Sequence, residues 1–379
     1  MRIAILTRDY PSDGDLYKYP FVHRRVLAYV AGGHKVHVLK LAPKSGCHTF
    51  DGIKCRSVEA GQFADAVTAV SPDVIAIHGF DERMWAAVSA LNGRWPICAW
   101  LHGSEIPAFY REKAKRLPDD EERRDALKSV IRRAEFWRSI LSFWPKALNL
   151  AFVSRSSVDL MRQDLAFRWP ESPKAVVIHN PIDTDLFTYC PKTAGDRYNV
   201  LSIRPYDSST YGNDLAVSAV LALRSHPEFE RIRFSFLGDG PMFDAVLAPL
   251  QGFANVSIQR RFLRQEQIAA KHKENGIFLV PSRLDTQGVS RDEAMASGLV
   301  PVTNAVHAIP EFVDDSCAGL ADRDDVKGLA SQIAAMVDHP ALFLSRSAKA
   351  AARVRAQTAH DLVIRQELEW MERCSRATP

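Results

Sequence analysis

The sequence predicts an α/β fold made of two doubly wound, Rossmann-like domains. Short apolar runs alternate with longer helical patterns, which is typical of parallel sheets covered by helices. This alternation forms two series, separated by a polar stretch with proline and glycine near residues 184–197. A chain of 379 residues is long enough to give each domain a core of its own.

The first series predicts an N-terminal domain, which we expect to span residues 1–187. A helical pattern follows the first strand and is closed by Gly32 and Gly33. The expected strands of this domain are 2–7, 35–41, 74–78 and 96–102.

The second series predicts a C-terminal domain over residues 198–357. We expect a ligand in the cleft that faces the carboxyl ends of the strands, as in other doubly wound folds. The C-terminal stretch from about residue 341 to 374, which begins inside this domain and continues beyond it, has a helical pattern. The expected strands of this domain are 199–203, 232–238, 255–259, 277–282 and 299–303.

The composition is that of an ordinary globular protein, with 46% apolar and 25% charged residues. Six scattered cysteines form no metal-ligand pattern, so they predict free thiols in a reducing compartment. The chain opens on a short strand pattern rather than a signal peptide, and it has no long apolar run. We therefore expect a cytoplasmic protein. A net charge of +4 suits anionic ligands but is too weak to indicate a nucleic acid partner.

Residues 281–313 combine features that suit a ligand with both phosphate and hydroxyl groups. Asp285 and Glu293 flank Gly288, which permits a tight turn, and Ser290 is expected to open a helix. The helix N-terminus offers N–H groups and partial positive charge to a diphosphate. The carboxylates accept hydrogen bonds from sugar hydroxyls.

The same stretch has a purely structural interpretation. Ser290 and Glu293 also fit a capping box, in which the glutamate bonds back to the backbone N–H of the serine. The pattern alone does not separate a ligand site from a helix cap.

Further residues carry a resemblance to a known family. The signature consists of Asp285, then Glu293-Ala-Met-Ala-Ser-Gly, then Pro301-Val302 and Pro310-Glu311. It resembles the donor site of the retaining glycosyltransferases of family four, in which the first acid is usually Glu. The resemblance implies the GT-B fold, with a last helix over about 358–379 that returns to the first domain. It also implies transfer with retention and no metal or other cofactor.

The resemblance assigns the nucleotide-sugar donor to the C-terminal domain. It implies that Glu293 binds the ribose, that Arg204 binds the diphosphate, and that Asp285 acts on the transferred sugar. The turn and helix start would complete the donor site with Gly288, Val289 and Ser290.

One position departs from the family pattern. Tyr211, followed by Gly212, stands where the family usually has a lysine that binds the diphosphate. Either another cation, such as Arg283 or Arg291, replaces the lysine, or Arg204 and the helix dipole suffice. For Arg283 and Arg291 a structural role is the favoured interpretation.

In the N-terminal half, two histidines follow expected strands. His102 resembles the family's histidine near the donor sugar and acceptor, whereas His78 is expected to be structural. Glu105 and the loop that contains Gly14 are predicted to lie on the acceptor side.

Residues 177–187 resemble the family's interdomain segment. Asn180, Asp183 and Phe187 keep its spacing, and Pro181 replaces the usual glycine. An Asx-type turn explains most of this pattern physically.

Residues 126–148 predict an amphipathic helix with basic flanks. Basic residues beside aromatic ones suit a helix on an anionic membrane. A helix that faces the core and exposes a basic flank fits equally well. The apolar positions are Leu127, Val130, Ile131, Ala134, Trp137, Leu141, Trp144 and Leu148, and the basic positions are Lys128, Arg132, Arg133, Arg138 and Lys146.

These observations predict a retaining glycosyltransferase that uses a nucleotide diphosphate sugar and a glycan or lipid-linked acceptor. Synthesis of a surface polysaccharide such as lipopolysaccharide or capsule is the expected role, with peripheral attachment to the inner face of the membrane. A nucleotide-sugar epimerase and a non-catalytic glycan-binding or scaffold protein are the alternatives. Tyr211 in place of the family's lysine keeps open the alternative of a non-catalytic protein.

Overall fold

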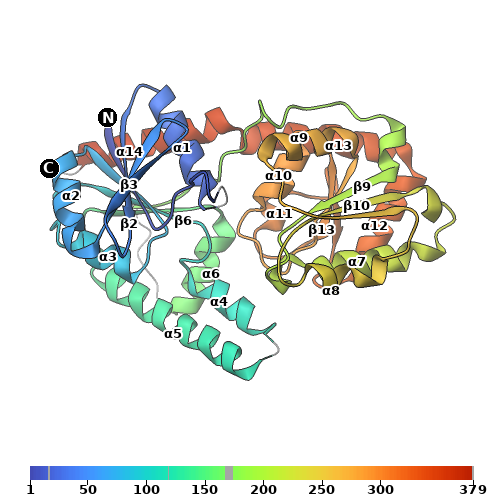
Figure 1. Cartoon of the computed structure of the whole chain (residues 1–379), viewed down its shortest axis with the longest axis horizontal. Helices are drawn as coiled ribbons and strands as arrows, with labels where there is room; N and C mark the ends of the chain where they lie inside the picture. The colour runs from blue at the N-terminus through green and yellow to red at the C-terminus, as the bar shows by residue number, and fades with distance from the viewer. Residues whose placement is uncertain (16–17, 118, 167–173, 378–379) are drawn as a thin grey trace. The chain divides into compact units, whose positions relative to one another are not determined.

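The computed structural model describes residues 1–15, 18–117, 119–166 and 174–377, and it consists of two compact α/β units. The first unit contains Met1–His179 and Val363–Pro379, and the second contains Asn180–Leu362. Each unit has one twisted sheet with helices on both faces (Figure 1). The predicted fold class is therefore confirmed, including the last helix that returns to the first unit.

The sheet of the first unit has the strand order β3-β4-β2-β1-β5-β6-β7-β8. All neighbouring strands are parallel except β3 and β4, which form an antiparallel hairpin that the sequence patterns did not predict. The strands are β1 Arg2–Thr7, β2 Lys35–Leu41, β3 Gly46–Phe50, β4 Ile53–Val58, β5 Val74–His78, β6 Ile97–Leu101, β7 Leu148–Phe152 and β8 Ala175–Val177.

Two separate apolar clusters cover the two faces of this sheet. On one face, α1 (Pro20–Ala31) and α14 (His360–Ala377) pack their apolar residues on β1, β5 and β6. The other face is covered by α2 (Phe63–Val70), α3 (Glu82–Ser89), α5 (Asp120–Ser142) and α6 (Arg155–Leu165). The helix α4 (Pro107–Ala114) lies beside α5.

A buried ion pair joins α14 to α1 inside the first unit. Nε of Arg25 lies 2.9 Å from a carboxylate oxygen of Glu367, and both side chains are fully buried. The hydroxyl of Tyr29 donates to the other carboxylate oxygen at 2.5 Å. Because a buried charge needs a partner, α14 is an integral part of this unit.

The sheet of the second unit has the order β11-β10-β9-β12-β13-β14, with parallel strands throughout. The five predicted strands are present, and β14 is an additional edge strand. The strands are β9 Asn199–Ile203, β10 Arg233–Gly238, β11 Val256–Arg260, β12 Ile277–Leu279, β13 Val300–Asn304 and β14 Gly319–Ala321.

Helices also cover both faces of the second sheet. An apolar cluster on one face includes residues of α7 (Asn213–Ala222), α8 (Phe243–Leu247) and α12 (Val326–Asp338). Smaller clusters on the other face include α9 (Gln265–Glu274), α10 (Val289–Ala296), α11 (Ile309–Phe312) and α13 (Pro340–Gln357).

The boundary between the units lies earlier than the predicted stretch at 184–197. The chain enters the second unit at Asn180, and the segment that follows packs on that unit. Phe187 is fully buried, and Nζ of Lys192 donates to the backbone carbonyl of His272 at 2.7 Å. The polar composition of this segment reflects turns bound to the second unit rather than a linker.

The amphipathic helix predicted at 126–148 begins and ends earlier. Asp119 caps it by accepting the backbone N–H groups of Glu121 and Glu122, and the helix ends at Ser142, before Pro145. Its buried face includes Ala134 and Trp137 as expected, whereas Leu127 and Ile131 are exposed. In the described parts of the chain, no helix combines the length and apolar composition that a membrane span requires.

Candidate active site

The start of α10 is built around Gly288. This residue is the N-cap of the helix and has a φ of 96°, a left-handed conformation that favours glycine. A Cβ atom here would lie 2.8 Å from the guanidinium of Arg291. The helix begins at Val289 and has no side-chain cap, so the structural alternative, a capping box of Ser290 and Glu293, is not formed.

Arg204 directly follows β9 and lies against this helix start. Its Nη1 donates to the hydroxyl of Ser290 at 3.1 Å, and its guanidinium lies 4.8 Å from the ring centre of Tyr211. The side chain is almost fully buried, and burial lowers its pKa while the negative charge of Asp285 opposes that shift. Within the described chain, the buried Nε of Arg204 has no hydrogen-bond partner.

Both of the other candidate cations already pair with carboxylates. Arg283 is held by Asp214, at 2.6 and 2.7 Å, and by Asp324 at 2.6 Å. Arg291 is buried and paired with Asp292 at 2.6 Å. The Tyr211 position therefore supplies an aromatic ring for Arg204 rather than a second charge.

Gln287 fixes the turn before α10, although nothing in the sequence marked it. Its side-chain oxygen accepts the backbone N–H of Asn180 at 2.6 Å, and its amide group donates to the carbonyl of Asn180 at 3.0 Å. It also donates to Asp292 at 3.2 Å, and its backbone N–H binds Asp285 at 3.1 Å. A buried glutamine with several partners holds this loop to the first residue of the unit.

The Asn180–Phe187 segment forms the expected Asx-type turn. The carboxylate of Asp183 accepts the backbone N–H of Leu186 at 2.9 Å and that of Asp185 at 3.2 Å. Glu293 is buried in the body of α10, three residues after Ser290.

In the first unit, His102 and His78 lie together at the carboxyl ends of β6 and β5. Nε2 of His102 is 3.0 Å from Nδ1 of His78, and the two rings are stacked with centroids 5.3 Å apart. The ring of Phe21 from α1 packs on His102 at 4.6 Å. His78 is fully buried, whereas His102 is partly exposed.

The two residues predicted on the acceptor side have different surroundings. The carboxylate of Glu105 is buried and accepts the backbone N–H groups of His102 and Gly103 at 2.9 Å each, so it shapes the turn after β6. Burial raises its pKa, an effect that Arg8 and these N–H groups oppose. Gly14 lies in an exposed turn, and a Cβ atom there would meet nothing within 4 Å.

Arg8 was not among the predicted site residues, although it directly follows β1. Its Nη1 lies 3.2 Å from Asp81 and its Nη2 donates to the hydroxyl of Tyr19 at 2.8 Å. A Cβ atom at Gly79 would lie only 2.7 Å from its Nε. A charged residue at the carboxyl end of a buried strand was a usable signal, because these ends converge on one edge of the sheet.

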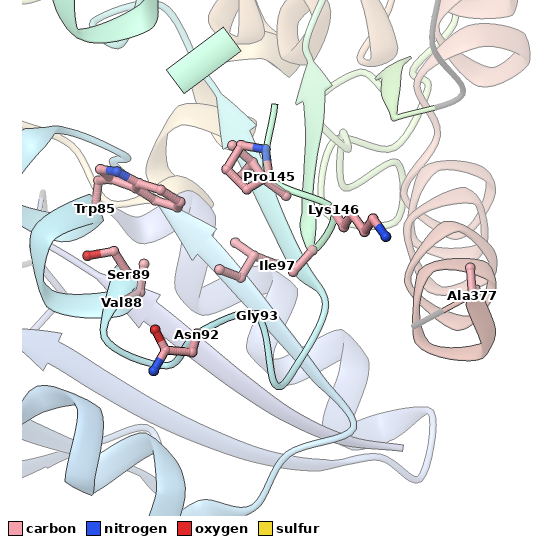
Figure 2. Close-up of a pocket in the computed structure, with 11 residues that line it drawn as sticks. Trp85, Val88, Ser89, Asn92, Gly93, Ile97, Pro145, Lys146 and Ala377 are labelled. Carbon is pink, nitrogen blue, oxygen red and sulfur yellow. The ribbon is translucent and has the colours of Figure 1, made fainter. Parts of the chain in front are cut away.

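A separate cavity of about 490 Å³ lies at the opposite, amino-terminal ends of β6 and β7. Figure 2 shows side chains from α3 and from the segment after α5 around it, with Ala377 of α14 nearby. Its walls are mainly apolar, and Ser89, Asn92 and Lys146 are among the polar lining residues. Lining residues include Trp85, Ser89, Asn92, Ile97, Pro145 and Lys146.

Comparisons with known proteins agree with this architecture. Residues 199–339 match the family described as "Glycosyl transferases group 1". The chain is also similar to the MMP alpha-(1->4)-mannosyltransferase of Mycolicibacterium hassiacum, with 26% identity over 220 residues. That match covers 56% of this chain and spans about half (51%) of the mannosyltransferase.

Solved structures are similar over nearly the whole chain. A glycosyltransferase from Rickettsia africae has a TM-score of 0.72 at 13% identity, with 98% of each chain covered. Sucrose-phosphate synthase from Thermosynechococcus elongatus has a TM-score of 0.74 at 14% identity, with 100% of both chains covered. Anabaena HepE has a TM-score of 0.71 at 16% identity, with 98% of this chain and 99% of HepE covered. The chain thus has the GT-B fold, and residues 199–339 of its second unit are similar to the glycosyl transferases group 1 family.

Proposed function

We propose that this chain is a retaining glycosyltransferase that moves a sugar from a nucleotide diphosphate sugar to a hydroxyl of a glycan or glycolipid. The observation that carries the proposal is the position of Arg204 beside the N-terminus of α10, in the domain that matches the glycosyltransferase family. The first N–H groups of a helix lack partners within the helix and attract anions. A guanidinium and a helix N-terminus together form a diphosphate site.

Each donor contact has a proposed role. Arg204 and the turn at Gly288, Val289 and Ser290 bind the diphosphate, and Glu293 binds the ribose. Asp285, whose charge acts on Arg204, faces the transferred sugar. Negative charge develops on the diphosphate as it departs, so positive groups fixed in place beforehand favour the transition state.

His102 is the proposed residue of the first unit that orients the sugar and the acceptor. Glu105 sets the backbone of the turn that carries His102, so its contribution to the acceptor side would be indirect. We propose that the reaction needs neither a metal ion nor another cofactor, and that the product belongs to a surface polysaccharide such as lipopolysaccharide or capsule.

Nucleotide binding provides the first test. A thermal-shift screen of UDP, GDP, dTDP and ADP identifies the base, and UDP is a natural first choice because HepE was solved with UDP and glucose. Arg204→Ala should weaken binding of the nucleoside diphosphate by about 1.5–3 kcal/mol and that of the nucleoside far less. Arg283→Ala, which removes a nearby arginine held by two carboxylates, is the matched control. Equal losses for diphosphate and nucleoside would contradict the site.

Product analysis separates the proposal from its alternatives. An epimerase would change the donor sugar without an acceptor, whereas a binding protein would hold the nucleotide and release no sugar. A retaining transferase yields a glycosylated acceptor whose anomeric configuration matches that of the donor, whereas an inverting transferase would reverse it.

A peripheral membrane contact through α5 is a second part of the proposal. Leu127 and Ile131 lie one helical turn apart and are exposed to 45% and 59%, and Phe143 after the helix is exposed to 89%. The exposed basic side chains of the same helix include Arg124, Lys128 and Arg132. By contrast, Arg133 is buried and pairs with Glu82 at 3.0 Å.

Liposome co-sedimentation tests this contact. Vesicles with anionic lipid should bind the protein at low salt, and changing Arg124, Lys128 and Arg132 to Glu should abolish binding. The control changes Arg233, Lys327 and Lys349 of the second unit to Glu, which alters the net charge equally. If both triple variants lose binding to the same degree, the interaction reflects overall charge rather than α5.

A further inference from the structure

His78 is the last residue of β5, and it meets the candidate catalytic histidine directly. Its Nδ1 lies 3.0 Å from Nε2 of His102. The His78 ring is also stacked on Trp100, with centroids 4.9 Å apart and an interplanar angle of 27°. His78 was expected to be structural, and its contact with His102 gives it a second possible role, because the bond also constrains the ring of His102.

The surroundings of His78 favour its uncharged ring. Burial lowers its pKa well below the ordinary value, and positive charge on His102 or Arg25 acts in the same direction. Arg25 is fixed by its ion pair with Glu367, so its positive charge stays in place. The favoured form of His78 is therefore the neutral imidazole, which carries one ring proton.

The position of that single proton follows from the other ring nitrogen. Nε2 of His78 is buried and has no hydrogen-bond partner in the described parts of the chain. A buried N–H without an acceptor is rarer and more costly in proteins than an acceptor that lacks a donor. The proton of His78 is therefore favoured on Nδ1, from which it points to His102.

We propose that His78 is a positioning residue that donates its Nδ1–H to Nε2 of His102. This bond holds His102 in one orientation and in the tautomer whose only ring proton is on Nδ1. The inference rests on the proposed function in one respect: the hydrogen bond from His78 can affect turnover only if His102 acts on the substrate.

The hydrogen bond also disfavours protonation of His102. A protonated His102 would carry an N–H on Nε2, the atom that accepts the proton of His78. The bond would then have to break, or reverse with the His78 proton moved to its buried, unpartnered Nε2. Other titratable groups near the pair are Arg25 on α1, Glu105 on the turn after β6, and the strand-end cluster of Arg8, Asp81 and Tyr19.

The tautomer can be observed without any enzymatic assay. Long-range ¹H–¹⁵N spectra of protein labelled with ¹⁵N-histidine should show a proton on Nδ1 of His102 and none on Nε2. In His78→Leu, which keeps apolar packing on Trp100, the Nε2–H form of His102 should appear and its pKa should rise. A wild-type His102 protonated on Nε2, or an unchanged His102 in the variant, would overturn the proposal.

Turnover gives the second readout, with nucleotide release from UDP-glucose or GDP-mannose as the probe. His78→Leu should lower kcat roughly tenfold, with the donor KM nearly unchanged, because one hydrogen bond is lost away from the donor contacts. The acid limb of its pH profile should move to higher pH. His78→Asn places an amide N–H near the Nδ1 position, and it should recover most of the lost kcat.

A second buried histidine provides the control. His272 of the second unit lies 3.3 Å from the hydroxyl of Ser297, and its pKa is lowered by burial to about 3. His272→Leu should lower Tm without moving the pH profile. If His78→Leu also lowers only Tm, His78 is structural and the proposal fails. If the wild type releases nucleotide from neither donor, that result counts against the proposed transfer. The tautomer of His102 in the NMR spectra then decides on its own whether His78 donates a hydrogen bond to His102.

Discussion

The two units place their candidate functional side chains by different means. In the first unit, His78 ends β5 and His102 follows β6, and the parallel register pairs His78 with Trp100, two residues before His102. In the second unit, only Arg204 follows a strand directly. Its partner Ser290 lies in a helix start whose position depends on a left-handed glycine.

This difference determines how much each site tolerates change. Strand ends are fixed by a ladder of backbone hydrogen bonds that no single side chain controls. The turn before α10 depends on individual side chains, because Gln287 links it to Asn180 and Arg291 fills the space behind Gly288. We therefore expect single substitutions to damage the donor side more than the histidine side.

The largest expected effect is on the free energy of unfolding, and it is measured on alanine variants of two glycines that each lie against an arginine. Gly288→Ala should lower the free energy of unfolding by about 3 kcal/mol, because the strain of a left-handed alanine adds to displacement of the buried Arg291 from Asp292. Gly79→Ala has similar backbone strain (φ 81°), but Arg8 is partly exposed and can move, so we expect about 1–2 kcal/mol. Chemical unfolding of both variants measures the difference. A larger loss for Gly79→Ala would reverse the comparison.

The next effect concerns the ring beneath Arg204. Tyr211→Leu removes the cation–π contact and should weaken nucleoside diphosphate binding by about 1 kcal/mol, as measured by calorimetry. Tyr211→Phe keeps the ring and should bind as the wild type does. If both variants lose the same affinity, the hydroxyl of Tyr211 matters and the ring contact does not.

The smallest effect is a pH dependence in the first unit. Burial raises the pKa of Glu105 in the folded state, so folding favours its protonated form. Its contribution to stability is fully present below the unfolded pKa and is lost as pH rises through the folded pKa. Glu105→Gln cannot ionise, so its Tm relative to the wild type should increase as pH rises above about 4.5. A constant Tm difference across this range would show that Glu105 does not titrate as proposed.

The strand pattern made most of the fold predictable, since buried parallel strands are continuous apolar runs in sequence. The antiparallel β3–β4 hairpin was not predicted, because most of its residues are exposed or half-buried and form no apolar run in the sequence. Cys47 and Lys54 are two of its exposed residues. The start of α10 was placed one residue late, because Ser290 and Glu293 imitate a cap that Gly288 provides through its backbone.

The candidate site was predictable only where side chains follow strands or family motifs. The long-range bonds of Gln287 join positions more than one hundred residues apart, and a single sequence contains no signal for such a pair. The same holds for the pairing of Arg283 with Asp214 and Asp324, which joins residues far apart in the sequence.

The ion pair between Arg25 and Glu367 also affects how the protein is made. The strands of the first unit emerge from the ribosome well before α14, since the whole second unit lies between them in the chain. Until α14 has been synthesised, Arg25 has no carboxylate from that helix, and the apolar face under Trp370 stays uncovered. The first unit therefore cannot complete its core until the second unit has been translated. Premature termination before residue 363 should leave exposed apolar surface that chaperones and proteases recognise.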